Sequence, residues 1–486
     1  MRLLLLLLLM PAVLYGQGIS NLWMMGYFSG FPSFGGVDID FYSGSPVITH
    51  VSREMNFSTT SVSMCDSSGD LLFYSNGAYI ANALGDTMIN GSGLSPGYYT
   101  DATGWNGLFI PQAALVVPHP GNASRYYLFH GTIDDSVSYA YRLYYSDIDM
   151  SLDSGRGAVI SKNNVLLNDT LIPGRITAVK HGNGRDWWVV VHEGKTENYY
   201  IFLVDPSGVH QGNQSIGTFR DSRHGQVCFS PQGDKFAYYD AVNDLDIMDF
   251  DRCTGRFSNP IHVSINDSAA GGGVAFSPSG RFLYVSSITR AYQFDMQAPN
   301  IPGSQLTVAV WDSTYSPSPP TATTFYQAQL APDGKIYVSC GNSTLEIHVI
   351  NFPDSLGLAC DFCQHCIQLP AYNAFTMPNH PNYFLGADQG SLCDTLINTI
   401  SVLQNEDARM TLFPNPVKAL LYARTGIENV LEIGIYNSLG EKLEVSSVPV
   451  NNGEYIQINA SSLASGVYFV EILTGRQRFV NRFVKE

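Results

Sequence analysis

Charged residues are scarce in this chain, and one sign dominates among them. Only 14% of the 486 residues are charged, and 42 Asp and Glu against 26 Lys and Arg leave a formal net charge of -16. An acidic surface repels phosphate backbones and anionic lipids, so nucleic acid is not an expected partner. After the N-terminal region no apolar run approaches the roughly 20 residues of a membrane span, so we expect no transmembrane segment.

Motifs of several enzyme classes are lacking as well. The 11 His include no His-Glu-x-x-His pair, which would have predicted a zinc protease. We also expect no Gly-x-Ser-x-Gly nucleophile elbow. Gly271-Gly-Gly273 precedes a predicted strand, whereas a phosphate-binding loop leads from a strand into a helix. The sequence therefore assigns no catalytic, cofactor-binding or metal-binding residue, and we predict no cofactor.

The N-terminus has the pattern of a secretory signal peptide. Arg2 supplies a positive charge, and a short apolar run follows over residues 3–14. This pattern predicts a signal peptide over residues 1–18, with cleavage after Gly16 or, as the second choice, after Gly18. An uncleaved anchor helix is the alternative, which the shortness of the run disfavours.

A strand–turn–strand pattern recurs through the middle of the chain. Its clearest copies are residues 227–238, 274–285 and 328–339, each with a Pro-x-Gly turn between two apolar strands. The turn glycines of all six copies are Gly69, Gly121, Gly184, Gly233, Gly280 and Gly334. Their mean separation is about 53 residues, and a second hairpin follows most copies. A four-stranded sheet repeated at such a period is typical of a WD40-like β-propeller.

The period predicts an all-β fold with a seven-bladed β-propeller over residues 19–390. Only six copies of the hairpin are visible, so we expect the seventh blade to be shared between the two ends of this region. Strands near residues 36–48 would then pair with strands near residues 372–385, which would close the ring and hide its edges. A β-sandwich with coincidental turn spacing is the alternative.

Several segments resemble a family of secreted bacterial propeller proteins of unknown activity. The segments that carry the resemblance are residues 36–46, 65–77, 88–94, 249–258, 273–286, 368–373 and 381–386. The resemblance covers most of residues 20–395. It implies an exported propeller, and it implies no particular reaction.

The C-terminal part of the chain has a different pattern. A polar linker is predicted over residues 391–410, and residues 411–486 alternate apolar and polar side chains in short strands. This alternation predicts a small immunoglobulin-like β-sandwich. The order of its segments closely resembles the type A C-terminal sorting domain of the type IX secretion system. The matching motif residues are Pro414, Asn415, Pro416, Gly440, Gly466, Tyr468 and Lys485.

This second resemblance implies where the protein acts. It predicts passage through the periplasm to the outer cell surface or the medium. The expected partners are the type IX secretion machinery and its sortase-like peptidase. The chain departs from many members of the family by ending on Glu486 rather than on a basic residue. An ordinary binding sandwich that stays attached is the alternative.

Eight Cys in an exported chain predict disulfides. The candidates are Cys360, Cys363, Cys366, Cys393, Cys228 and Cys253. We expect Cys393 to pair with one of the three cysteines in residues 360–366, and a bridge between Cys228 and Cys253 is plausible because one hairpin separates them.

The remaining cysteines and a histidine leave alternatives open. Cys65 and Cys340 would either pair with each other or stay free and buried. His365 lies within the 360–366 cluster, so a zinc site is an alternative there, although the usual second pair of ligands is lacking.

An acidic cluster follows the fourth turn glycine. Its members are Asp240, Asn243, Asp244, Asp246, Asp249 and Asp251. Alternating Asp residues on a strand predict a solvated face. A calcium site is the alternative, although the spacing does not match an EF-hand loop.

Two functions are consistent with these patterns. The first is a non-catalytic binding or adhesion module for an extracellular glycan or protein. The alternative is an extracellular propeller hydrolase, resembling a lactonase. Converging carboxylate, Asn or His side chains with metal-like geometry in the central channel would favour the enzyme.

Overall fold

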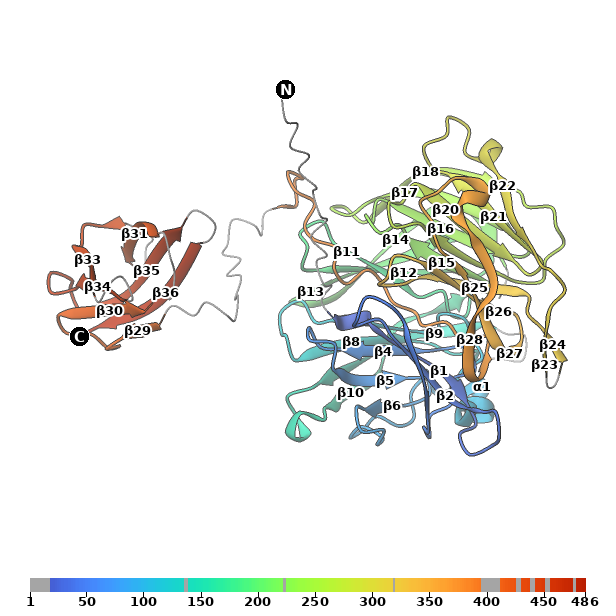
Figure 1. Cartoon of the computed structure of the whole chain (residues 1–486), viewed down its shortest axis with the longest axis horizontal. Helices are drawn as coiled ribbons and strands as arrows, with labels where there is room; N and C mark the ends of the chain where they lie inside the picture. Colours follow the sequence, from blue (N-terminus) through green and yellow to red (C-terminus); the bar gives the residue numbers. More distant parts are fainter. Residues whose placement is uncertain are drawn as a thin grey trace, which may run out of the picture. The chain divides into compact units, whose positions relative to one another are not determined.

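The computed structural model describes nine stretches of the chain. They are residues 18–134, 139–221, 224–317, 320–394, 411–424, 430–437, 442–450, 455–474 and 478–486. Most of the predicted signal peptide and most of the predicted linker therefore lie outside the described residues. The structure is almost entirely β (Figure 1), and the α-helix in the described stretches is α1 (Tyr98–Thr103). No described helix has the length and apolar character to cross a membrane.

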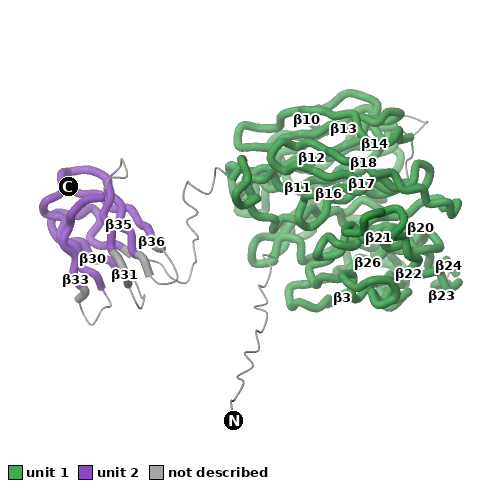
Figure 2. Tube along the Cα trace, turned by 90° about the horizontal axis from the view of Figure 1, so that it is seen from above, with its two compact units in different colours: residues 1–396 green, residues 397–486 purple. Residues whose placement is uncertain are grey.

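Two compact units make up the chain, Met1–Leu396 and Ile397–Glu486 (Figure 2). The first unit consists of antiparallel sheets whose strands follow one another in chain order. Sheet 1 has β1 (Leu22–Tyr27), β2 (Gly35–Asp40) and β3 (Val47–Val51), and sheet 2 has β4 (Val62–Cys65), β5 (Leu71–Ser75) and β6 (Ile80–Asn82).

The next three sheets have four strands each. Sheet 3 contains β7 (Ala114–Pro118), β8 (Arg125–His130), β9 (Ala140–Asp149) and β10 (Ala158–Leu171). Sheet 4 contains β11 (Thr177–Lys180), β12 (Trp187–His192), β13 (Thr196–Asp205) and β14 (Gly208–Arg220). Sheet 5 contains β15 (Gly225–Phe229), β16 (Lys235–Asp240), β17 (Asp244–Asp251) and β18 (Arg256–Val263).

Two further four-stranded sheets complete the unit. Sheet 6 contains β19 (Gly273–Phe276), β20 (Phe282–Ser287), β21 (Arg290–Asp295) and β22 (Leu306–Val310). Sheet 7 contains β25 (Phe325–Leu330), β26 (Ile336–Cys340), β27 (Ser343–Ile350) and β28 (Phe362–Ala374). A hairpin of β23 (Tyr315–Pro317) and β24 (Pro320–Ala322) lies between them, and the 3-10 helices are Gly18–Ser20, Gly104–Asn106, Asp153–Gly155, Pro302–Ser304 and Gly357–Cys360.

The six predicted turn glycines all lie between the first and second strands of sheets 2 to 7. Five of them have φ between 73° and 92°, a backbone conformation that residues other than glycine adopt only at a cost in free energy. At Gly233 a Cβ would also lie only 2.7 Å from Val179 of the neighbouring sheet. Turn conformation and close packing therefore both require glycine there.

Apolar clusters join each sheet to the next. Sheets 5 and 6, for example, share a cluster that contains Tyr239 and Val285. Sheet 7 packs against sheet 1 in the same way, where Trp23 contacts the ring of Tyr337 with centroids 5.6 Å apart. The first strands of the sheets contact one another in chain order, from β1 and β4 to β25. Sheets packed face to face in a closed series define a β-propeller fold.

The predicted pairing between residues 36–48 and residues 372–385 is wrong. β1 to β3 form a sheet of their own, and Asn373 and Ala374 pair with β27. β28 already completes sheet 7, so no strand position is left for the N-terminal residues. The seam between sheets 7 and 1 is closed by buried side chains instead of by a strand ladder.

Residues 375–385, which we call the channel segment, follow β28 and run along the first strands of the sheets. Thr376 contacts the carbonyl of Phe57 before β4 begins, whereas Asn382 reaches the carbonyl of Pro231 after β15 ends. The segment therefore passes from the beginnings of the first strands to their ends. It fills the space that these strands enclose.

The second unit has two four-stranded antiparallel sheets. One has the order β29 (Thr411–Phe413), β30 (Leu420–Arg424), β34 (Tyr455–Asn459), β33 (Ser447–Val450), and the other β32 (Lys442–Leu443), β31 (Val430–Asn437), β35 (Gly466–Thr474), β36 (Arg478–Lys485). Leu421 and Ile458 of the first sheet and Val470 and Phe483 of the second share one buried cluster. The unit thus has its own core.

Candidate functional site

The first strands of a propeller leave one edge of backbone groups facing the channel, and these groups need partners. Two glutamines supply them across the channel. The amide of Gln112 accepts from the N–H of Val227 and donates to its carbonyl, both at 2.9 Å. Gln226 likewise accepts from Val274 at 3.1 Å and Ala328 at 2.9 Å. These buried amides connect strands of different sheets.

The channel segment provides further partners of this kind. Asn379 is 6% exposed and donates to the carbonyls of Ala114 and Ile176, both at 2.9 Å. Its own carbonyl accepts from Gln112 at 3.1 Å. The hydroxyl of Tyr383 donates to the carbonyl of Val116 at 2.9 Å. Polar groups of the segment are thus engaged by the edges of the first strands.

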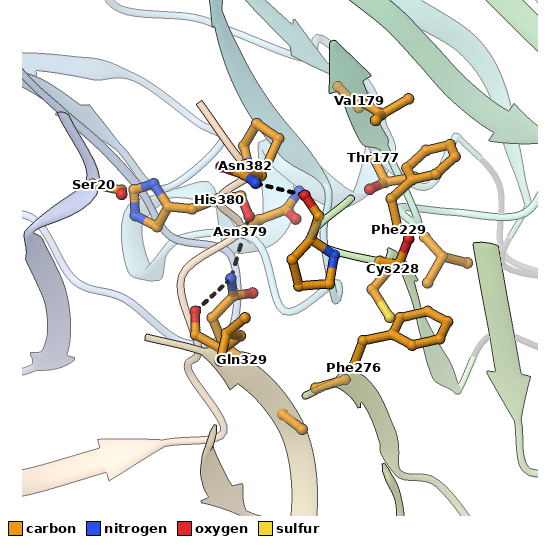
Figure 3. A pocket seen from close by; sticks show the side chains of 18 of the residues that line it. Ser20, Thr177, Val179, Cys228, Phe229, Phe276, Gln329, Asn379, His380 and Asn382 are labelled. Atoms are coloured by element: carbon orange, nitrogen blue, oxygen red, sulfur yellow. Dashed lines mark hydrogen bonds between the residues drawn. The ribbon is translucent and has the colours of Figure 1, made fainter. Parts of the chain in front are cut away.

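A cavity of about 230 Å³ remains at the turn end of the channel (Figure 3). Phe229 and Phe276 line one side, and His380 and Asn382 of the channel segment line another. Phe384, which is 42% exposed, also lines the cavity. Among the described residues that line it there is no carboxylate.

Burial keeps the ionisable groups of this cavity neutral. It lowers the pKa of His380 to about 4, so the imidazole is uncharged at neutral pH. It raises the pKa of the Cys228 thiol well above its ordinary value. A neutral thiol and a neutral imidazole surrounded by amides and phenyl rings suit binding by packing and hydrogen bonding.

The structure pairs Cys393 with Cys253, whose Cα atoms lie 5.5 Å apart. The predicted partner in residues 360–366 is therefore wrong for Cys393. The channel segment carries the chain away from sheet 7 to the turn after β17 of sheet 5. Cys393 therefore lies beside Cys253, although 140 positions separate the two residues in the sequence. The sequence alone did not show that these residues are neighbours.

The suggested bridge between Cys228 and Cys253 is also not formed. β16 separates β15 from β17, and two strand spacings amount to about 10 Å, beyond the reach of a disulfide. Cys228 remains free, as do Cys360, Cys65 and Cys340.

A second disulfide joins Cys363 to Cys366. It uses two of the three thiols that the alternative zinc site would need. The imidazole of His365 lies 2.7 Å from a carboxylate oxygen of Asp312 instead. In the described part of the chain no group of three or more His, Cys, Asp or Glu could hold a metal ion.

The acidic cluster is divided among ion pairs rather than gathered around a cation. Arg220 contacts Asp240 at 2.7 Å and Asp246 at 2.9 Å, and all three side chains are buried. Burial alone would raise the pKa of Asp246, but Arg220 and hydrogen bonds from Thr218 lower it below its ordinary value. The expected solvated face is thus partly an interior ion-pair network.

The expectation that the chain has no Gly-x-Ser-x-Gly pattern is wrong. Gly93-Leu-Ser-Pro-Gly97 matches the Gly-x-Ser-x-Gly pattern of hydrolases and directly precedes α1. Ser95 has φ 48°, and its hydroxyl lies 2.8 Å from Nδ1 of His130. The other ring nitrogen meets the hydroxyl of Ser146 at 2.9 Å, where a triad would have a carboxylate.

This serine and histidine lie in the interior. Ser95 and His130 are completely buried. Burial lowers the pKa of His130 to about 3, which makes it a poor base at neutral pH. The pattern could have been found from sequence, but its burial could not.

The sorting-motif residues hold the second unit together. Asn415 donates to the carbonyl of Arg482 at 3.1 Å and accepts from the N–H of Val484 at 2.9 Å. Tyr468 stacks on Phe483 and donates to the carbonyl of Ala464 at 2.9 Å.

Other motif residues differ in exposure. Pro414 and Pro416 are exposed, Gly466 is half-buried, and Lys485 is 9% exposed beside the carbonyl of Glu486. Gly440 lies outside the described residues.

Comparison with known families agrees with the second resemblance. Residues 411–486 match the family described as the secretion system C-terminal sorting domain, at the boundaries predicted from sequence. The protein is thus exported by the type IX secretion system to the cell surface or the medium. Its sorting domain implies interaction with the secretion machinery.

Comparison with solved structures gives β-propellers among distant neighbours. A Bacteroides uniformis protein described provisionally as a 6-phosphogluconolactonase is 13% identical, with a TM-score of 0.46, and the match covers 74% of this chain and 98% of that one. A Lactobacillus plantarum protein is 14% identical over 73% and 98%, with a TM-score of 0.42. The β-propeller domain of Cps50 from Myceliophteria thermophila is 9% identical over 67% and 94%, with a TM-score of 0.37. No curated protein sequence matches this chain.

Proposed function

We propose that this protein is an exported, non-catalytic binding module. In this proposal the seven sheets are the seven blades of one propeller, and the second unit is an immunoglobulin-like sandwich removed or retained after export. The ligand is an extracellular glycan or protein. The signal peptide and sorting domain deliver the propeller, which does the binding.

The observation that carries this proposal is the channel segment. In the alternative enzyme, charged side chains from several blades would converge in the channel. Here the channel segment occupies that space. The side-chain amides of Gln112, Gln226 and Asn379 form hydrogen bonds with backbone groups of the first strands. The cavity that remains is bounded by phenyl rings, amides and a neutral imidazole.

An array of glycans and peptides, probed with the purified exported protein, tests the proposal. Reproducible binding to one ligand class, without turnover of that ligand, is the expected result. The same preparation would be assayed for hydrolysis of aldonolactones and of the bound ligand. Hydrolysis that tracks the protein through purification and is lost in Ser95→Ala or His380→Ala would replace the binding module by an enzyme.

A further inference from the structure

Arg175 is a buried cation in the loop before β11. Its side chain is 1% exposed, and Nη1 donates to the carbonyl of Pro173 at 2.6 Å. The atoms Nε and Nη2 have no hydrogen-bond partner. These two atoms form the edge through which a guanidinium binds a carboxylate by two parallel hydrogen bonds.

The other buried arginines of the described chain are partnered. Arg53 pairs with Asp38, and Arg220 pairs with two aspartates. Arg252 donates to three backbone carbonyls. A buried charge without such partners is costly. Arg175 is therefore the exception that calls for an additional group.

Tyr238 links this arginine to further unpartnered polar atoms. The atoms are the hydroxyls of Tyr199 and Tyr238, Nε of Arg220 and both ring nitrogens of His192. With the two atoms of Arg175 they make seven of the 13 buried side-chain atoms without a partner in the described chain. We call these five residues the donor cluster.

The donor cluster is compact. The rings of His192 and Tyr199 lie 4.4 Å apart, and the guanidinium of Arg220 lies 4.5 Å from the ring centre of Tyr238. Burial raises the pKa of Tyr238 to about 12, and Arg175 opposes this rise more strongly than any other charge. Because most of these groups donate, the complementary occupant is an acceptor-rich oxyanion.

Aromatic rings lead from the surface to Arg175. Phe109 is 47% exposed and meets Phe375 with ring centroids 4.8 Å apart. Phe375 meets Tyr326 at 5.7 Å, and Arg175 is close enough to Tyr326 to oppose the rise that burial causes in its pKa. Phe375 begins the channel segment, so these three rings lie at the end of the channel opposite the cavity.

The loop that carries Arg175 is held in an unusual conformation. Gly174 has φ 74°, and Arg175 itself has φ 51°. Hydrogen bonds from Arg175 N–H to the carbonyl of Pro111 and from Ile176 N–H to that of Gln112 hold it there. Strained residues of this kind occur at ligand sites, where position matters more than local stability.

We propose that Arg175 binds the carboxylate of an acidic sugar, which reaches it past Tyr326 and Phe375. The inference rests on the proposed binding function and names its ligand class. The guanidinium edge takes the planar carboxylate, and the rings pack against the apolar face of the pyranose. The net charge of -16 repels polyanions, so a single terminal uronic acid fits better than a polyuronate.

Calorimetry on the mature full-length protein with D-galacturonic acid and D-galactose tests this directly, because the two differ at the carboxylate. We expect the acid to bind at least about tenfold tighter. Arg175→Gln should remove this preference, and Arg175→Lys should also lose most of it, since a lysine lacks the two-pronged edge. Arg281→Gln is the matched control, because its exposed side chain pairs with Asp295 of sheet 6.

Equal affinity for the two sugars, no binding of either, or an unchanged preference in Arg175→Gln would overturn the proposal. Tighter binding of inorganic phosphate than of galacturonate would overturn the assignment to a sugar acid. If Arg175→Gln does not fold, melting of the wild-type protein decides. Stabilisation by galacturonate but not galactose supports the site, and no selective stabilisation refutes it.

The outcome separates this inference from the binding function itself. Array binding that Arg175→Gln retains, without preference for acidic sugars, would refute the Arg175 site and leave the binding module intact. Galacturonate binding at Arg175 in a protein that turns over its ligand would support the site and refute the non-catalytic function.

Discussion

The two units of the chain differ in the chemistry of their interiors. Residues 411–486 contain seven Lys and Arg, seven Asp and Glu, no His and no Cys. The rest of the chain holds all 11 His, all eight Cys and the entire net charge of -16. The described core of the second unit is apolar, whereas the first unit buries ion pairs, amides and imidazoles. Reductant and mild acid should therefore act on the first unit and spare the second.

The sharpest test of this division is removal of residues 411–486. We expect a folded propeller that stays in the periplasm, because its buried clusters draw on the first unit alone. Cell fractionation locates the truncated protein, and melting of the purified product checks its fold. Truncated protein at the surface or in the medium would contradict the sorting role. Unfolded protein in the periplasm would contradict the independence of the units.

Loss of the Cys253–Cys393 disulfide should be the next largest effect. It closes a loop with a sequence separation of 140, so Cys253→Ser should reduce the free energy of unfolding of the first unit by at most about 5 kcal/mol. Denaturant titration with and without reductant measures this loss. Cys363→Ser is the control, since its disulfide spans three residues and constrains the unfolded chain little. A shift of the second unit's transition would contradict the division.

Mild acid should weaken the first unit only. Burial lowers the pKa of His130, His192 and His348 to about 3 and that of His380 to about 4. Below their ordinary pKa these groups take up protons in the unfolded chain but not in the folded one, so stability falls as pH falls. From pH 6.5 to 5.5 the loss is about 1 kcal/mol for each histidine.

Calorimetric melting at both pH values measures this loss. The transition of the second unit, which has no histidine, serves as the internal control. A first-unit transition that is equally stable at the two pH values would show that these imidazoles are protonated in the folded protein.

Asn379→Ala should destabilise the first unit by about 2–3 kcal/mol, because the carbonyls of Ala114 and Ile176 lose their buried donor. Asn382→Ala removes one bond to Pro231 and should cost less. Denaturant titration ranks the two. Equal losses, or none, would mean that the channel segment does not support the strand edges.

The smallest effect belongs to the second unit. Asn415→Ala removes two exposed hydrogen bonds to β36, with an expected loss of about 1 kcal/mol in the second unit alone. Calorimetric melting resolves which transition moves. Movement of the first transition would mean that the units are coupled.

Local chemistry explains which parts of the fold could be predicted. Gly69 and Gly334 could be identified as turn residues because a tight turn needs a residue with positive φ. The few residues around each glycine are enough to define such a turn. The alternation in residues 411–486 likewise follows from burial of one strand face, and Asn415 was identified through its motif. These features need no knowledge of distant contacts.

The remaining features depend on distant parts of the chain. Residues 375–385 have no strand period, and only the channel formed by several sheets explains their hydrogen bonds. Cys393 found Cys253 because that segment crosses to sheet 5. Arg175 is unremarkable in sequence, and Ser95 carries a hydrolase motif within a closed interior. In these cases burial decides the chemistry, and burial is a property of the assembled sheets.

The position of the channel segment has a consequence for the order of folding. Residues 375–385 are synthesised after all seven sheets, yet they fill the space those sheets enclose. Until translocation delivers this last segment, the first strands lack their partners. Final assembly of the first unit is therefore a post-translocational, cooperative step.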